Sequence, residues 1–203
     1  MMRKKKNGML DSFKNIVPDL PKKLDEKEFE IPLSFNSQKW SAEITGSEFF
    51  YDDFSEGEEI HHLDGQTIEE AEHQIATRLY QNNARVHFNN NIEKDGRFGK
   101  RIIYGGYIIS LARAISCNGL ANAFKILAIH SGRHAAPTFS GDTIYAWSKI
   151  LKKNKINESL GALLIRTIAS KNDSNMNFPE KDKLLENMVL DLEYSVLIPL
   201  KKK

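Results

Sequence analysis

The sequence has a single cysteine, Cys117, among its 203 residues. One cysteine cannot build an internal disulfide framework, and the chain contains neither a CxxC pair nor an HExxH pair that would predict a metal site. An excess of one charge is also missing, because 29 Lys and Arg residues face 27 Asp and Glu residues and leave a formal net charge of +2. These absences exclude a secreted domain stabilised by disulfides. They also argue against a nucleic-acid partner, because proteins that bind nucleic acid usually carry a larger excess of basic residues.

The chain also lacks a long apolar run. Its first twenty residues are basic but hold no continuous apolar region, so we expect no signal peptide, no membrane partner and a cytoplasmic location. The length suits one domain with a substantial core and is short for two full domains. Residues 1–45 show little periodicity and contain three interrupting prolines, which predicts a connector or surface strap before a domain at 46–203.

A first amphipathic helix is predicted to begin near Thr67. Thr67 with Glu70 three residues later has the spacing of a capping box, in which two side chains satisfy free backbone donors at a helix start. Apolar residues recur at spacings of three and four, which predicts one buried stripe: Ile68, Ala71, Ile75 and Leu79. Polar side chains then crowd residues 81–87 and make this turn the candidate for chemistry.

A second helix is predicted over about 105–116, apolar on several faces and therefore buried in the core. It is too short to span a bilayer, and Arg113 interrupts it. Gly105 and Gly106 open the helix, where backbone N–H groups have no partner within the helix. Because glycine has no side chain, a ligand oxygen that gains negative charge could approach these donors closely, although close helix packing also accounts for glycine here.

Strand patterns surround the two helices. Residues 59–67 predict a short strand and turn before the first helix. Four runs after the second helix predict further strands, the last of which alternates cleanly over 188–199. His61 and His62 are adjacent and would point to opposite faces of a strand, so they cannot share one metal ion. The order of elements predicts an α+β fold in which an antiparallel sheet wraps around the buried helix.

Three runs carry a resemblance to a known family: ATRLYQNNARVHFN from Ala76, GRFGKRIIYGGYIISLARAISCNGLAN from Gly96 and SGRHAAPTFSGDTIYAWS from Ser131. In this order they resemble MaoC-type hotdog dehydratases, and among these the mesaconyl-CoA hydratases. The resemblance implies a hotdog fold and reversible addition of water to mesaconyl-CoA, giving β-methylmalyl-CoA, with an acyl-CoA substrate and no metal or redox cofactor. It also implies two hotdog units in one chain, of which this sequence resembles the second.

The resemblance further implies which residues act. In related R-specific hydratases the turn reads Asp-x-Asn-Pro-x-His, and the Asp and His hold and activate water. The histidine falls on His87, whereas Asn82, Ala84 and Arg85 stand at the other three marker positions. His87 is therefore the predicted acid/base, since imidazole exchanges protons near neutral pH. Asn82 is predicted to orient the water, with a helix cap as the plainer alternative.

Two groups of residues are predicted to bind the substrate: the start of the second helix and Arg85. Gly105, Gly106 and the amide of Tyr107 would hold the thioester oxygen. Arg85 would bind the free carboxylate of mesaconyl-CoA, because a guanidinium pairs with carboxylates in bidentate fashion, although a surface ion pair is the commoner role of arginine. Glu93 or Asp95 could supply a second acid, and His130, Arg133 and His134 near the end of a predicted strand could face the same cleft.

Two rival functions remain at this stage. Hotdog folds also host acyl-CoA thioesterases, since a fold does not fix a function. Alternatively, the chain is a non-catalytic partner subunit of a split hydratase. Because two hotdog units normally face each other to complete a pocket, we expect either a homodimer or a heteromer with a separate first hotdog unit.

Overall fold

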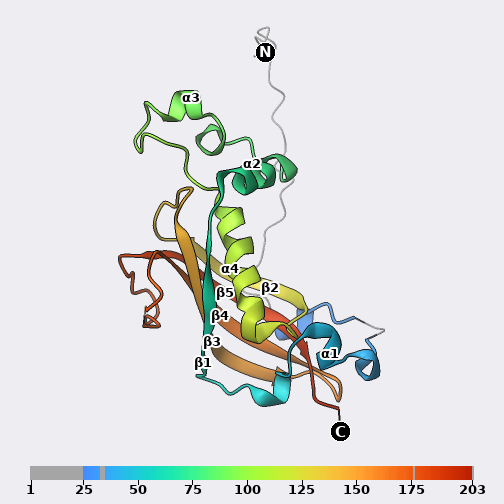
Figure 1. The fold of residues 1–203 in the computed structure, drawn as a ribbon. Coiled ribbons are helices and arrows are strands. Elements are labelled where there is room, and N and C mark those ends of the chain that lie inside the picture. Colours follow the sequence, from blue (N-terminus) through green and yellow to red (C-terminus); the bar gives the residue numbers. More distant parts are fainter. Residues whose placement is uncertain (1–24, 33–34, 176, 203) are drawn as a thin grey trace, which may run out of the picture.

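The computed structural model describes residues 25–32, 35–175 and 177–202. A five-stranded sheet curves around one long helix, α4 (Gly105–Leu120), as Figure 1 shows. The strands are β1 (Glu59–Thr67), β2 (Lys125–His134), β3 (Thr143–Lys155), β4 (Leu160–Lys171) and β5 (Met188–Pro199). Their order is β1-β3-β4-β5-β2 and every neighbouring pair is antiparallel. The predicted α+β class, with a sheet wrapped around a central helix, is confirmed.

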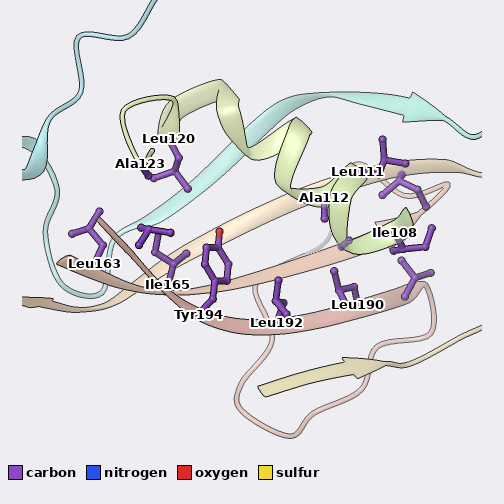
Figure 2. Close-up of a cluster of buried hydrophobic side chains, with 14 of the residues drawn as sticks. Ile108, Leu111, Ala112, Leu120, Ala123, Leu163, Ile165, Leu190, Leu192 and Tyr194 are labelled. Atoms are coloured by element: carbon purple, nitrogen blue, oxygen red, sulfur yellow. The ribbon is translucent and has the colours of Figure 1, made fainter. Parts of the chain in front are cut away.

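The main core lies between α4 and the concave face of the sheet (Figure 2). Apolar side chains one and two turns apart on the helix meet alternate side chains of β4 and β5: Ile108, Leu111, Ala112 and Leu120 against Leu163, Ile165, Leu190, Leu192 and Tyr194. This packing explains why apolar residues alternate along these strands. It also places the first turn of α4 at a fixed position relative to β5.

Two burial predictions were wrong. The helix α4 is not buried all round, because Ser110, Ala114 and Cys117 are exposed on the face that the sheet does not cover. Strand β5, by contrast, is covered on both faces. On the second face of the sheet, Phe178 and Leu185 from the connection before β5 pack against a smaller apolar cluster of Trp147, Ile168 and Met188, of which Met188 belongs to β5.

The first helix also differs from its prediction. The helix α2 spans Glu70–Leu79, and Thr67 is the last residue of β1, where its hydroxyl bonds that of Thr143. No capping box forms, because strand pairing with β3 occupies Thr67. The buried face of α2 carries His73, Ala76 and Thr77, whereas Ile75 and Leu79 are 54% and 73% exposed. Of the predicted stripe, only Ile68 is fully buried.

Short helical turns complete the chain: η1 (Glu26–Glu28), η2 (Ser37–Lys39), α1 (Ala42–Thr45), η3 (Tyr51–Asp53), η4 (Arg85–His87) and α3 (Asn90–Glu93). Residues 1–24 of the predicted connector lie outside the described residues. The described part packs along the sheet, where Glu30 accepts a hydrogen bond from Lys125 and Trp40 donates one to Asn122. Within the described ranges, no helix combines the length and apolarity needed to cross a membrane.

Candidate active site

His87 ends the 3₁₀ turn η4, which follows α2 after a short polar turn. Its Nδ1 lies 3.0 Å from the carbonyl oxygen of Ile102. A carbonyl can only accept, so Nδ1 carries the hydrogen and donates it, and Nε2 of the neutral ring keeps a free lone pair. The hydrogen bond therefore leaves His87 with a proton acceptor directed away from its anchor.

The backbone around His87 is held by side chains from two other segments. Gln74 on α2 donates to the carbonyl of His87 at 2.9 Å, and Arg101 donates to the carbonyl of Phe88 at 3.1 Å. Arg101 also pairs with Glu70 at the start of α2. The turn that presents the imidazole is thus tied to α2 and to residues 101–102, which precede α4.

His73 is a site residue that the sequence analysis missed, since it lies outside the predicted apolar stripe of the first helix. The side chain is only 1% exposed, and its Nε2 accepts the N–H of Tyr104 at 2.9 Å. Burial is the main cause that lowers the pKa of His73 to about 4, and the electrostatic influence of the neighbouring His87 and Arg101 side chains acts in the same direction, so the ring stays neutral. The His73 and His87 rings are nearly perpendicular, with centroids 6.3 Å apart. The sequence pattern that could have identified it is the spacing of His73, Ala76 and Thr77, which are three and four residues apart and therefore share one face of the helix.

The start of α4 supplies two open backbone donors. In the described part of the chain, no acceptor binds the amides of Gly105 and Gly106, as expected for the first residues of a helix. The prediction that Tyr107 offers its amide was wrong, because that N–H bonds the carbonyl of Tyr104 at 3.0 Å. The side chain of Tyr107 instead donates to Glu72 at 2.9 Å, and burial with this carboxylate raises its pKa to about 12.

Aromatic rings lie directly over both glycines. A Cβ atom on Gly105 would meet Nε2 of His134 at 2.5 Å, and one on Gly106 would meet the hydroxyl of Tyr104 at 2.6 Å. Neither position accepts alanine unless a ring moves. His134, at the end of β2, therefore lies at the start of α4, and burial lowers its pKa.

The two remaining predicted residues have local partners. Asn82 accepts the N–H of Ala84 at 2.9 Å, so its side-chain oxygen stabilises the turn and only its NH₂ group is open. Arg85 is exposed, and its Nε lies 3.8 Å from a carboxylate oxygen of Glu93. Among the residues that the structure describes, neither side chain bonds His87, and no three His, Cys, Asp or Glu side chains gather to hold a metal ion.

A separate cavity of about 910 Å³ lies on the sheet face that is turned away from α4. It is lined by the described strap near Phe29 and by His130, Lys152, Lys181 and Glu193, among others. Of the candidate residues it contains His130 alone, so His130 faces this cavity and not the start of α4. Its mixed charges favour no single class of ligand.

The chain matches two curated proteins over most of its length. It is 48% identical over 204 residues to beta-methylmalyl-CoA dehydratase of Chloroflexus aurantiacus, covering 98% of this chain and 58% of that protein. It is 42% identical over 186 residues to mesaconyl-CoA hydratase of Cereibacter sphaeroides, covering 90% of this chain and 53% of that protein. The chain thus spans a little over half the length of these relatives. No protein-family model matches it.

Solved structures agree on the fold. A MaoC domain protein from Chloroflexus aurantiacus J-10-fl, named a dehydratase, superposes with a TM-score of 0.84 at 50% identity, over 92% of this chain and 55% of that chain. A Mycobacterium tuberculosis protein with a double hotdog fold superposes with a TM-score of 0.57 at 21% identity, over 84% and 48%. The chain is therefore a homologue of the MaoC-type hotdog dehydratases, as its sequence resemblance predicted.

Proposed function

We propose that this chain is an acyl-CoA hydro-lyase that adds water reversibly across the double bond of mesaconyl-CoA to give β-methylmalyl-CoA. The observation that supports this most strongly is the free Nε2 lone pair of His87 in a segment that is hydrogen-bonded to the residues leading into α4. The names of the two curated relatives agree with this substrate. Hydration of an enoyl thioester requires a base for water and donors for the enolate oxygen, and this arrangement offers both.

In the proposed reaction, Nε2 of His87 removes a proton from water as the water oxygen attacks the β carbon. The electron pair of the double bond moves through the α carbon to the thioester oxygen. The amides of Gly105 and Gly106, at the positive end of α4, stabilise that oxygen, and one such donor contributes about 3 kcal/mol in well-studied enzymes. The imidazolium then returns the proton to the α carbon, so that one water has been added and His87 is neutral again.

Two more residues are assigned to substrate and water. The open NH₂ group of Asn82 would donate to the water or to the product hydroxyl. Arg85 would bind the free carboxylate of mesaconyl-CoA. Its ion pair with Glu93 is long and the arginine is 64% exposed, so exchanging Glu93 for a substrate carboxylate costs little.

We also propose that the chain works as a pair of hotdog units, either as a homodimer or with a separately encoded first unit. Its curated relatives are nearly twice as long. Strand β2 is an edge of the sheet, and Ile126 and Ile129 on it are exposed. An edge strand with exposed apolar side chains favours pairing with another chain.

The test is loss of enoyl-thioester absorbance when the full chain is mixed with mesaconyl-CoA. The assay is run with the chain alone and with any small hotdog protein encoded beside it. Turnover in either case supports the proposal, and none in both contradicts it. In a parallel assay the protein is mixed with a saturated acyl-CoA and a reagent that detects free thiols. Release of free CoA in that assay, without hydration of mesaconyl-CoA, would identify a thioesterase instead.

A further inference from the structure

We infer that the phenolic hydroxyl of Tyr104 is a third hydrogen-bond donor to the thioester oxygen of the substrate, beside the amides of Gly105 and Gly106. This inference rests on the proposed function and adds a substrate-contacting side chain to that site. It follows from where the ring of Tyr104 lies, from the hydrogen bonds that its hydroxyl lacks, and from its neighbours.

The ring of Tyr104 folds forward over the first turn of α4. A Cβ atom on Gly106 would lie 2.6 Å from the Tyr104 hydroxyl oxygen. Because Cβ and N of one residue are about 2.5 Å apart, this oxygen lies within about 5 Å of the Gly106 nitrogen. One acceptor oxygen can then receive both hydrogen bonds, the O–H at about 2.7 Å and the N–H at about 2.9 Å. The hydroxyl and the amide are therefore close enough to bind the same atom.

The Tyr104 hydroxyl has no hydrogen-bond partner within the described residues. Two nearby tyrosines differ in this respect, since Tyr107 on α4 donates to Glu72 and the Tyr194 hydroxyl bonds Thr167 and Arg113. This hydroxyl is not fully buried, so an incoming ligand can reach it. The O–H of Tyr104 is thus a donor left for a ligand.

The neighbours of Tyr104 place this donor beside the proposed base. The Tyr104 and His87 rings have centroids 5.7 Å apart, inclined at 61°. The backbone of Tyr104 is held by His73, which accepts its N–H, and by the first turn of α4, whose Tyr107 and Ile108 amides bond its carbonyl. The phenol therefore stands on a fixed backbone between the imidazole and the glycine amides.

The first experiment removes only the oxygen atom. Tyr104→Phe should lower kcat on mesaconyl-CoA about 100-fold, with little change in KM, because the donor acts chiefly on the charge that develops in the transition state. Tyr80→Phe is the matched control, since Tyr80 is an exposed tyrosine whose ring lies 6.5 Å from that of Tyr104, and it should leave kcat unchanged. A wild-type rate for Tyr104→Phe would overturn the inference, and a faster rate for Tyr104→Ala would show that the ring only blocks the site.

The second experiment moves the hydroxyl instead of deleting it. Gly106→Ala places a methyl group where the phenol end lies, so the ring must swing away. If Gly106→Ala lowers activity by displacing the Tyr104 hydroxyl, it should cost much less activity in the Tyr104→Phe background than in the wild type. Equal costs in the two backgrounds would contradict the inference, because Gly106→Ala would then act without Tyr104.

A third readout does not depend on turnover. Carbonyl-labelled crotonyl-CoA bound to the His87→Ala variant should show a C=O stretch at lower frequency than in water, and Tyr104→Phe should reverse part of that shift. A Tyr104-dependent shift without hydration of mesaconyl-CoA would retain the inference and reject the proposed substrate. Hydration with no effect of Tyr104→Phe on rate or stretch would reject the inference alone. Failure of every form to bind a CoA thioester would reject both.

Discussion

At the residue scale, the chemistry available to His87 depends on its partner. The carbonyl of Ile102 fixes the hydrogen on Nδ1 and leaves Nε2 as the acceptor. In many hydrolytic sites a carboxylate holds the base histidine in this way, whereas here a backbone carbonyl does so, and no side-chain substitution can remove it. The imidazole itself is therefore the group to test.

His87→Ala should lower kcat on mesaconyl-CoA by about 10²- to 10⁴-fold, the range for loss of a general base. The variant loses one part-buried hydrogen bond, so its free energy of unfolding should fall by only about 1 kcal/mol. Steady-state rates and thermal unfolding measure the two effects. His61→Ala is the control, because His61 is exposed and contacts Trp147 on β3. Similar activity losses in both variants would refute a catalytic role for His87.

Arg85→Ala should affect substrates unequally. If Arg85 binds the free carboxylate, kcat/KM for mesaconyl-CoA should fall about 10-fold or more, while crotonyl-CoA, which lacks that carboxylate, should change less than about 2-fold. Arg97→Ala removes another exposed arginine from the same loop and should spare both substrates. Equal losses on the two substrates would assign Arg85 to folding of the loop.

At the element scale, one buried hydrogen-bond chain joins β1, α4, β3, β4 and β5. Its direction is fixed, because His62 must donate from Nδ1 to the carbonyl of Asn118 and each hydroxyl has one hydrogen to give. The donors follow in one order: Arg113 to Tyr194, Tyr194 to Thr167, Thr167 to Ser148, and Ser148 to Nε2 of His62. The chain ends where α4 breaks at Asn118 and Gly119, so it fixes β1 against the end of this helix.

This chain predicts a loss of stability in mild acid. Burial lowers the pKa of His62 to about 4, against about 6.5 in the unfolded chain. Between these values the unfolded state binds more protons, so the contribution of His62 is complete above pH 6.5 and is lost as the pH falls towards 4. At pH 5 the loss is about 2 kcal/mol, and His73 adds to it in the same direction.

Urea unfolding at pH 7 and pH 5 measures this effect. His62→Gln should be less stable at pH 7 but should lose less stability between the two pH values than the wild type. His61→Gln is the control, because His61 is an exposed neighbour on the same strand, and it should keep the wild-type pH dependence. An unchanged pH dependence in His62→Gln would show that other groups cause the acid sensitivity.

Elements with a local pattern could be predicted from the sequence, and those decided by distant contacts could not. The existence of the strands and of α4 follows from local apolar patterns, whereas the order of the strands in the sheet was not predicted. The start of α2 could not be predicted, because Thr67 is taken by Thr143, 76 residues away. The two glycines were predicted from the unpaired donors of a helix start and His87 from a resemblance, whereas the roles of His73 and Tyr104 depend on how α2 and α4 meet.

At the scale of the whole molecule, several large apolar side chains remain exposed, and two groups of them bear on assembly. One is the outer face of α2 with Ile75, Leu79 and Tyr80, and the other is strand β2 with Ile126 and Ile129. The open face of α4, with Ala114 and Cys117, is also uncovered. These surfaces occur beside the sheet edge or beside the candidate site, as expected if a second hotdog unit completes the molecule.

Ile129→Lys should therefore disrupt assembly. Ile129 is 55% exposed on the edge strand β2, and burying such a side chain contributes about 2 kcal/mol, so a lysine there should weaken association by at least 10-fold. Light scattering after size exclusion should show an assembly of two hotdog units for the wild type and a monomer for the variant, with a parallel loss of hydratase activity. Leu63→Lys is the matched control, because Leu63 is 71% exposed on the opposite edge strand β1. A wild-type chain that is monomeric and fully active, or an Ile129→Lys variant that still assembles, would show that β2 is not the pairing edge.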